Sequence, residues 1–231
     1  MAVKGIFFDL YGTLFTYGDM QAGVVEWLSE FHACLRKHGL SISEESFVNY
    51  YHNRLSGVEV PRRDDDLTLF ERRIQIACSD LRINVAVSDI RHIATDILNV
   101  WNRYVFQDPN CMPVLETLRQ QHIILGLISN FDHPPHVRAL VRNSGLDTFL
   151  ATVVVSGDTG VKKPDSMIFD LALMETGLRG EDTIYVGDAE EDVVGANNAG
   201  MVSVLIDRNG HGKNYGQTHT IKSLRDILRF V

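Results

Sequence analysis

The sequence predicts an α/β protein with a parallel sheet whose two faces are covered by helices. From residue 109 onward, short apolar segments alternate with segments of helical periodicity, a pattern typical of β-α-β units. The apolar segments lack the alternation of a half-exposed strand, as expected when both faces of a strand are buried. A long block of helical periodicity between residues 19 and 107 interrupts this order, so we expect a separate helical part there.

Five segments are expected to form strands because they are rich in Val, Ile, Leu or Phe. They cover residues 3–8, 123–128, 152–155, 183–186 and 201–206. Parallel strands joined by right-handed crossovers place their carboxyl ends along one edge of the sheet, where the ligands of such folds bind. Asp9, Ser129 and Asp188 follow three of the strands, and Lys163 lies in the loop after a fourth. We therefore expect these four side chains to converge.

The other periodic segments are expected to be helices. In the block from 19 to 107, apolar residues recur at spacings of three and four, and Gly39 ends the first helix. Three more helices are expected to begin near Ser43, Leu67 and Ile90, and no strand is expected in this block. Among the strands, helices are expected over residues 114–121, 138–143, 168–176, 193–199 and 221–230.

The composition excludes several classes of protein. The chain has 231 residues, with 22 Lys and Arg against 30 Asp and Glu, which makes the formal net charge −8 and the pI about 5.5. Such an acidic chain matches the phosphate backbone of nucleic acids poorly. Three cysteines without a C-x-x-C pair predict neither a disulfide scaffold nor a zinc site, and histidines such as His32 are expected at the surface or as helix caps. Apolar runs fall short of the roughly 20 residues of a membrane span and the N-terminus is typical of a strand, so we expect a cytoplasmic protein.

Two of the converging residues, Asp9 and Asp188, carry like charges that repel each other at close range. A divalent cation would offset this repulsion, and Mg²⁺ commonly takes one or two carboxylates together with its substrate. Lys163 would balance the charge of Asp9 and of an anionic substrate. A carboxylate held near a metal ion and a lysine is a competent covalent nucleophile.

Donors for an oxyanion are expected at the same edge of the sheet. The hydroxyl of Ser129 and the backbone N–H groups of Gly12, Thr13 and Asn130 are the candidates. Arg208, which follows the last strand, is expected to form a salt bridge. The expected ligand is a small anionic molecule rather than a nucleic acid or a membrane, and we expect a monomer or a homodimer.

Four segments of the sequence occur in a specific order. They are Asp9-Leu10-Tyr11-Gly12-Thr13, then Ser129 at the end of an apolar strand, then Lys163-Pro164-Asp165, then Gly187-Asp188 followed by Asp192. This order resembles the four motifs of the haloacid dehalogenase (HAD) superfamily, over about residues 1–14 and 109–231. The resemblance implies a Rossmann-like, three-layer core with a helical cap domain between the first and second motifs (subfamily I), over residues 15–108. Hinges are expected near residues 15–18 and 108–113.

The resemblance implies a role for three residues in the reaction. Asp9 would be the nucleophile that forms an aspartyl intermediate, and Ser129 would bind an oxygen of the substrate. Lys163 would orient Asp9 and stabilise negative charge. It is preferred over its neighbour Lys162 because it directly precedes the proline.

The resemblance also implies a site for Mg²⁺. Asp9, Asp188 and the backbone carbonyl of Tyr11 would hold the ion, and Asp192 would be a water-mediated partner of it. A second interpretation of Asp192 is that it caps the helix that follows it, expected over residues 193–199, since Asp is common at helix N-termini.

Tyr11 departs from the pattern of the family's phosphatases, which carry a second aspartate at this position as general acid and base. A tyrosine with a pKa near 10 protonates a leaving alcohol poorly at neutral pH. General acid–base catalysis contributes roughly 10²- to 10⁴-fold, so ordinary alkyl phosphates should react slowly. The Asp-x-Tyr-Gly-Thr form is similar to the 2-haloacid dehalogenases, whose halide leaving group needs no proton.

The fourth motif favours the phosphatases instead. Dehalogenases of the family are metal-independent and have a Ser-Ser-Asn type of loop there, whereas this chain has Gly187-Asp188-Ala189-Glu190-Glu191-Asp192. So many carboxylates beside an anionic substrate favour a divalent cation. We therefore expect a Mg²⁺-dependent phosphatase acting on a small phosphorylated metabolite. The alternatives are a metal-independent 2-haloacid dehalogenase that uses Asp9 on carbon, and a non-enzymatic binding module.

Overall fold

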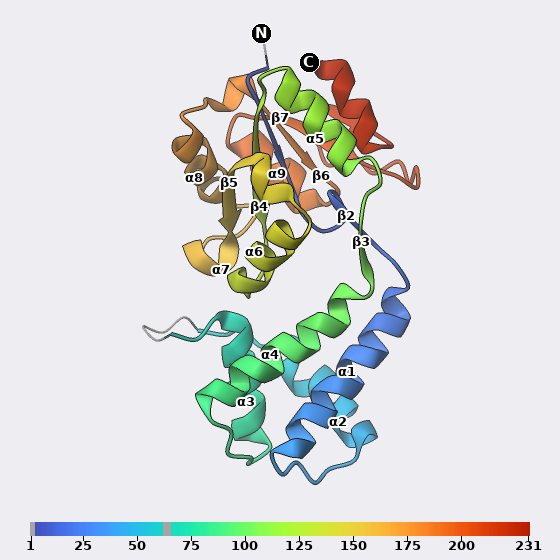
Figure 1. The fold of residues 1–231 in the computed structure, drawn as a ribbon, viewed down its shortest axis with the longest axis vertical. Coiled ribbons are helices and arrows are strands. Elements are labelled where there is room, and N and C mark those ends of the chain that lie inside the picture. The colour runs from blue at the N-terminus through green and yellow to red at the C-terminus, as the bar shows by residue number, and fades with distance from the viewer. Residues whose placement is uncertain (1–2, 62–65) are drawn as a thin grey trace. The chain divides into compact units, whose positions relative to one another are not determined.

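The computed structural model describes residues 3–61 and 66–231, which form two compact units (Figure 1). Unit 1 comprises the described residues up to Thr16 and from Gln107 to Val231, and unit 2 comprises Tyr17–Phe106. The chain passes from one unit to the other through β2 (Phe15–Tyr17) and returns through β3 (Val105–Gln107), and these strands form a two-stranded sheet. The boundaries expected from the sequence are 14/15 and 108/109.

Unit 1 contains a six-stranded parallel sheet. Its strand order is β5-β4-β1-β6-β7-β8, and neighbouring strands run parallel throughout. The strands are β1 (Gly5–Phe8), β4 (Ile124–Ser129), β5 (Leu150–Val155), β6 (Thr183–Gly187), β7 (Val202–Ile206) and β8 (His219–Ile221). Because β1 lies between β4 and β6, the chain proceeds in opposite directions on its two sides, and open α/β sheets bind their ligands at such a point.

Helices cover both faces of this sheet, as the sequence predicts (Figure 1). α8 (Ser166–Thr176) and α9 (Glu190–Asn198) pack on one face, in a core that includes Phe7, Ile128 and Tyr185. On the other face, α5 (Cys111–Gln120) packs against the C-terminal 3₁₀ helix η4 (Leu224–Phe230). The remaining helical segments are α6 (Pro134–Asn143), η2 (Leu146–Thr148), α7 (Ser156–Thr159) and η3 (Gly180–Asp182).

Unit 2 is built from helices around its own apolar core. They are α1 (Met20–Lys37), α2 (Glu44–Tyr50), the π-helical turn η1 (Tyr51–Leu55), α3 (Leu69–Asp80) and α4 (Val87–Asn102). Side-chain oxygens of Asp19, Ser43 and Thr68 accept hydrogen bonds from the first turns of α1, α2 and α3, which explains where these helices begin. Along the described residues of both units, none of the helices combines the length and the apolar character that crossing a bilayer requires.

Three local expectations from the sequence are wrong. β3 lies at the end of the block from residue 19 to 107, in which no strand was expected. The single helix expected over 221–230 is the strand β8 followed by the 3₁₀ helix η4, and Ile221 of β8 pairs with Ile206 of β7. His32 is buried, with Nε2 at 3.0 Å from the carbonyl oxygen of Ile42. Strands of three residues are too short for a periodic signal, and a histidine that pairs with a backbone carbonyl leaves no trace in the sequence.

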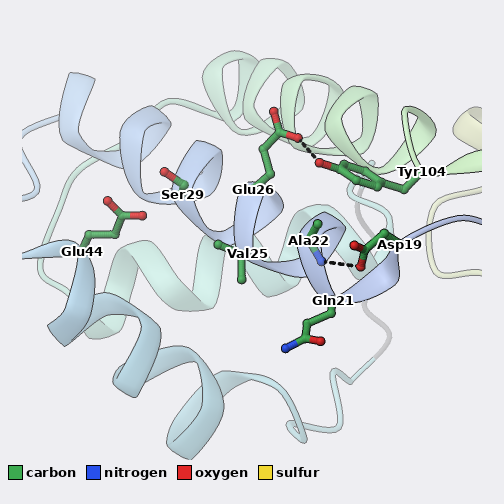
Figure 2. Close-up of a pocket in the computed structure, with 8 residues that line it drawn as sticks. All are labelled: Asp19, Gln21, Ala22, Val25, Glu26, Ser29, Glu44 and Tyr104. Atoms are coloured by element: carbon green, nitrogen blue, oxygen red, sulfur yellow. Dashed lines mark hydrogen bonds between the residues drawn. The ribbon is translucent and has the colours of Figure 1, made fainter.

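A solvent-open hollow lies on the surface of unit 2 (Figure 2). Its lining consists of Asp19, Gln21, Ala22, Val25, Glu26, Ser29, Glu44 and Tyr104. The hydroxyl of Tyr104 donates to Glu26 at 2.5 Å, and the backbone N–H of Ala22 donates to Asp19 at 3.0 Å. The backbone carbonyl oxygen of Tyr104 also accepts a hydrogen bond from the N–H of Gly18 at 2.8 Å. The contacts of this region therefore connect residues near the start of unit 2 with residues near its end.

The aromatic core of unit 2 should determine its stability. Phe47 is fully buried and packs edge-on against Phe31, with ring centroids 5.2 Å apart. We expect Phe47→Ala to lower the free energy of unfolding of unit 2 by about 3 to 5 kcal/mol, because the truncation leaves a cavity. Urea unfolding followed by tryptophan fluorescence measures this unit, since Trp27 and Trp101 both belong to it.

Val25→Ala is the control for this variant, because the Val25 side chain is 66 % exposed. It should change the free energy of unfolding by less than about 0.5 kcal/mol. Equal effects of the two variants would contradict the role of Phe47 in the core.

Candidate active site

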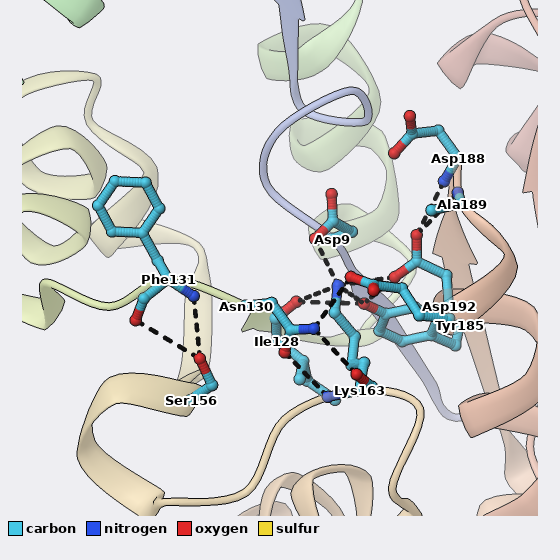
Figure 3. Close-up of polar contacts among 11 residues, drawn as sticks. Asp9, Ile128, Asn130, Phe131, Ser156, Lys163, Tyr185, Asp188, Ala189 and Asp192 are labelled. Atoms are coloured by element: carbon cyan, nitrogen blue, oxygen red, sulfur yellow. Dashed lines mark hydrogen bonds and ion pairs between the residues drawn. The ribbon is translucent and has the colours of Figure 1, made fainter. Parts of the chain in front are cut away.

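Three neighbouring strands of unit 1 lead to the polar residues that the sequence predicts to converge. Asp9 follows β1, Ser129 is the last residue of β4 and Asp188 follows β6. Lys163 comes from the loop between α7 and α8, and its ammonium reaches Asp9 from 154 positions away in the chain (Figure 3). The parallel sheet therefore places them at one edge, as the topology requires.

The buried ammonium of Lys163 is the centre of this site. Lys163 is 2 % exposed, and its Nζ donates to Asp9 Oδ1 at 2.6 Å and to Asp192 Oδ1 at 2.7 Å. The hydroxyl of Tyr185 lies at 3.2 Å and the carbonyl oxygen of Ile128 at 3.4 Å from the same nitrogen. A buried charge needs such partners to offset the loss of its hydration, and charge-assisted hydrogen bonds are the stronger kind. Lys163 therefore fixes the position of the Asp9 carboxylate.

Negative charge is in excess around Lys163. Burial raises the pKa of Asp9 above its usual range, Lys163 opposes this, and the neighbouring carboxylates Asp192 and Asp188 add to it. Burial and the charge of Asp192 raise the pKa of Asp188 to about 6. Burial alone would lower the pKa of Lys163, but Asp192 and Asp9 outweigh it and raise that pKa well above its usual value. The local field therefore favours an additional cation.

The carboxylates of Asp9, Asp188 and Asp192 form a donor set that fits a divalent cation. One oxygen from each lies within 4.8 Å of those from the other two. Hard carboxylate oxygens are the ligands that Mg²⁺ prefers, and the excess of negative charge supplies the attraction. The residues present therefore fit a magnesium ion.

Gly12 permits the close approach of the loop after Asp9 to Asp188. Its φ of +90° lies in the left-handed region, and a Cβ atom built on it would lie 2.3 to 2.4 Å from the carboxylate atoms of Asp188. A residue with a side chain would be strained by both conditions. The N–H of Gly12 donates to the carbonyl oxygen of Phe15 at 2.6 Å, so the turn itself uses the donor that the sequence assigns to an oxyanion.

Asp192 uses both of its oxygens on protein donors. Oδ1 accepts from Lys163 and from the hydroxyl of Tyr185, and Oδ2 accepts from the backbone N–H groups of Asp188 at 3.1 Å and Ala189 at 3.0 Å. The sequence expectation that Asp192 precedes and caps a helix is wrong in position, because α9 begins at Glu190 and Asp192 lies in its first turn. Its Oδ2 accepts from the N–H of the N-cap residue Ala189, so it closes this turn from within the helix. Asp192 thereby joins the loop of Lys163 to the loop of Asp188.

The buried hydroxyls of Ser129 and Thr13 lack a hydrogen-bond partner within residues 3–61 and 66–231. The two residues are 1 % and 0 % exposed. A buried hydroxyl without a partner costs free energy, which a bound ligand can recover. An oxyanion is such a ligand. The sequence predicts this role for the hydroxyl of Ser129, whereas for Thr13 it points only to the backbone N–H.

Asn130 contributes its side chain, whereas the sequence points only to its backbone N–H. Its Oδ1 accepts from the N–H of Lys163 at 2.9 Å, and its Nδ2 donates to the carbonyl oxygen of Lys163 at 3.0 Å. The same Nδ2 donates to Glu191 Oε1 at 2.9 Å, in the first turn of α9. Asn130 therefore holds the loop that carries Lys163.

Tyr185 is a site residue that sequence reasoning missed. It is 1 % exposed, and its hydroxyl contacts Lys163, Asp192 and the carbonyl oxygen of Ile128. One sign in the sequence could have identified Tyr185. It carries a hydroxyl within the otherwise apolar end of β6, a strand that is buried on both faces. Such a group requires internal partners.

Tyr11, in the loop that follows Asp9, packs against an aromatic ring. Its ring centroid lies 5.3 Å from that of Phe131, and the ring of Phe131 stacks on His136 at 5.4 Å. Burial, with His133 adding to it, lowers the pKa of His136 to about 4, so this imidazole is neutral at pH 7. Motif I therefore joins a charged group, Asp9, to an uncharged aromatic cluster.

Removal of one carboxylate should stabilise the metal-free protein near neutral pH. The pKa of Asp188 is about 6 in the folded protein, whereas its ordinary value is 3.8. The contribution of Asp188 to the free energy of unfolding is therefore fully present below pH 3.8 and is lost as the pH rises through 6. We expect Asp188→Asn to exceed the wild type in free energy of unfolding by about 1 to 2 kcal/mol at pH 7.5. Urea unfolding in EDTA at pH 7.5 and pH 4.5 measures this, and the difference should shrink at the lower pH.

Asp170→Asn, on the exposed side of α8, is the control and should change stability by less than about 0.5 kcal/mol at either pH. Equal free energies of unfolding for Asp188→Asn and the wild type at both pH values would show that the excess of negative charge has no energetic cost. This result would contradict the interpretation that the metal-free site is destabilised by its carboxylates.

Known proteins resemble this chain in sequence and in fold. Residues 3–200 match the sequence model of haloacid dehalogenase-like hydrolases. A glyceraldehyde 3-phosphate phosphatase from Methanopyrus kandleri is 37 % identical over 106 residues, which is 46 % of this chain and less than half, 45 %, of that protein. A glyceraldehyde 3-phosphate phosphatase from Methanocaldococcus jannaschii is 26 % identical over 239 residues, covering 99 % of this chain and 97 % of that protein.

A solved structure shares the fold. The HAD phosphatase from Thermococcus onnurineus aligns over 98 % of this chain and 97 % of its own, with a TM-score of 0.71 and 23 % identity. The family match over residues 3–200 includes Asp9, Ser129, Lys163 and Asp188 in the order that the resemblance requires. The protein therefore belongs to the haloacid dehalogenase-like hydrolase family and is a hydrolase.

Proposed function

We propose that the protein is a Mg²⁺-dependent phosphatase that hydrolyses a small phosphorylated metabolite through an aspartyl-phosphate on Asp9. The observation that carries this proposal is the 2.6 Å contact of Lys163 with Asp9 inside the cluster formed with Asp188 and Asp192. This contact holds a carboxylate oxygen at an anion-binding edge of the sheet. A small phosphorylated substrate is supported by the relative from Methanocaldococcus jannaschii. That protein is a glyceraldehyde 3-phosphate phosphatase, and this chain aligns with 97 % of its length.

The reaction proceeds in two displacements at phosphorus. A carboxylate oxygen of Asp9 attacks the phosphorus atom, and the bond to the leaving oxygen breaks with its electron pair. Water then attacks the same phosphorus, the bond to Asp9 breaks, and the carboxylate is restored with release of inorganic phosphate. Lys163 keeps its proton in both steps, because its carboxylate partners raise its pKa, and it stabilises the developing negative charge. The hydroxyls of Ser129 and Thr13 donate to phosphoryl oxygens.

Asp9, Asp188 and the backbone carbonyl of Tyr11 would hold Mg²⁺. The ion, when bound, would neutralise charge on the phosphoryl group and polarise it. Asp192 acts behind these ligands, because its oxygens hold Lys163 and the N–H of Asp188. Asp192 would therefore contact the ion only through a water molecule bound to the ion.

Unit 2 is the cap domain in this proposal. The chain inserts it after the strand that carries Asp9 and before the strand that carries Ser129. Its separate core allows it to vary independently of the sheet, and cap closure would exclude water from the reacting phosphoryl group. We further propose that the enzyme works in the cytoplasm.

Tyr11 favours a second candidate, the hydrolysis of a carbon–halogen bond in a small 2-halo acid. A halide leaves without a proton, so a tyrosine in place of an aspartate would cost nothing in that reaction. The acidic cluster favours the phosphatase, because an anionic substrate would be repelled by it without a cation. Halide release from 2-chloropropionate without Mg²⁺ would establish the second candidate and contradict the first.

Phosphatase activity should require both Asp9 and a divalent cation. We expect hydrolysis of p-nitrophenyl phosphate in Mg²⁺, loss of at least roughly 10³-fold in EDTA with recovery on adding Mg²⁺, and loss of a similar size in Asp9→Asn. Asp170→Asn should retain full activity. Colorimetric release of p-nitrophenol measures all of these, and equal rates with and without EDTA would refute the metal assignment.

Tyr11→Asp should supply the general acid that the chain lacks. Towards glycerol 3-phosphate, whose leaving alcohol needs a proton, we expect kcat to rise about 10- to 100-fold. Towards p-nitrophenyl phosphate the change should be several-fold smaller, because that leaving group departs without protonation. Tyr11→Phe is the matched control and should resemble the wild type on both substrates. A large loss in Tyr11→Phe would instead show that the phenol takes part in the reaction.

A further inference from the structure

Arg208 follows β7 and contacts the loop that comes after the nucleophile. Its Nη1 donates to the backbone carbonyl oxygen of Gly12, and its Nη2 donates to the carbonyl oxygen of Thr13 at 2.7 Å and to Asp108 Oδ2 at 2.8 Å. The last contact is the salt bridge expected from the sequence. All four residues lie in unit 1.

The two carbonyl contacts determine how the loop presents its backbone donors. In a trans peptide, the carbonyl oxygen of one residue and the N–H of the next point in opposite directions. Because Arg208 holds the carbonyl oxygen of Gly12, the N–H of Thr13 points away from the guanidinium. Thr13 also carries a buried hydroxyl that lacks a partner within the described residues. Arg208 thus orients two donors of a single residue, the backbone N–H that the sequence assigns to an oxyanion and this hydroxyl.

The third contact joins this loop to the point where the chain re-enters unit 1. Asp108 is 6 % exposed, and its Oδ1 accepts from the N–H of Asn110 at 2.8 Å. The N–H of Asp108 donates in turn to the carbonyl oxygen of Leu14 at 2.9 Å. Asp108 is therefore a fixed anchor for Arg208. A planar guanidinium can bind three acceptors in this arrangement, whereas a lysine ammonium presents its donors from one point.

We propose that Arg208 is a positioning residue for phosphoryl transfer, and that it holds the amide and hydroxyl of Thr13 in place for the phosphoryl oxygens. This inference rests on the proposed phosphatase function. Arg208 acts through Gly12 and Thr13, because its three hydrogen bonds go to protein oxygens. Displacement of an oxyanion donor by about 1 Å can cost roughly 10²-fold in rate, so a group that fixes such a donor has a measurable effect.

The test compares Arg208→Gln and Arg208→Lys with the wild type, each as the whole chain in Mg²⁺. Hydrolysis of p-nitrophenyl phosphate gives kcat, and inhibition by inorganic phosphate reports how well the site binds phosphoryl oxygens. We expect Arg208→Gln to lower kcat about 10- to 100-fold and to raise the inhibition constant of phosphate about 10-fold. Arg208→Lys keeps the charge but not the fork of donors, and it should show a smaller loss of the same kind.

Arg138→Gln is the matched control, because it breaks an exposed arginine–aspartate pair, with Asp158, at the same 2.8 Å. It should leave kcat and phosphate inhibition unchanged. If Arg208→Gln lowers only the melting temperature while its folded fraction keeps the wild-type kcat and phosphate inhibition, the proposal is wrong. If Arg208→Gln does not fold, unchanged kcat and inhibition in Arg208→Lys overturn it in the same way.

The failure of the proposed function gives a different result. In that case the wild type itself does not hydrolyse p-nitrophenyl phosphate or the alkyl phosphates. Calorimetric titration with inorganic phosphate in Mg²⁺ then tests Arg208 without turnover. Weaker binding by Arg208→Gln than by the wild type and Arg138→Gln supports the positioning role, and equal binding by all three overturns it.

Discussion

A single buried ammonium must hold together carboxylates that would otherwise repel one another, and the rest of the site is arranged around this constraint. Lys163 meets one group from each of the three central strands or their ends: Asp9 after β1, the carbonyl oxygen of Ile128 in β4 and the hydroxyl of Tyr185 in β6. Its loop is held in turn by the carboxamide of Asn130. The ammonium therefore joins three neighbouring strands and holds the Asp9 carboxylate in one position, as the proposed nucleophile requires.

Sheet topology also explains how much of the site was predictable. Strands buried on both faces are apolar along their length, so the polar residue that ends each one is conspicuous, and parallel pairing brings these ends together. Asp9, Ser129 and Asp188 follow from this rule. The contacts of Asn130, Tyr185 and Arg208 do not, because each depends on a partner between 7 and 196 positions away and on which atoms of the side chain meet it. The strands β2, β3 and β8 were missed for the same reason, since each has three residues and exists through its partner.

Motif I combines two environments within three residues. Asp9 lies among charges, whereas Tyr11 packs against Phe131, which stacks on the neutral His136. A charged side suits the phosphoryl group, and an aromatic side suits a leaving group that carries apolar surface. In the proposed phosphatase, Tyr11 would therefore change the polarity beside the leaving group as well as the protonation of that group.

Backbone hydrogen bonds close the chain on itself at both ends of the inserted segment. Asp108 donates to Leu14 within unit 1, and Gly18 donates to Tyr104 within unit 2. The strand that leaves unit 1, β2, and the strand that returns to it, β3, are therefore neighbours. The helices between them form a single insertion in the chain of unit 1. Main-chain bonds of this kind do not depend on side-chain identity. Whole helices can therefore be gained, lost or exchanged between these two endpoints without changing the register of the sheet. The inserted segment can diverge in evolution while the residues at the carboxyl ends of the strands in unit 1 keep their positions.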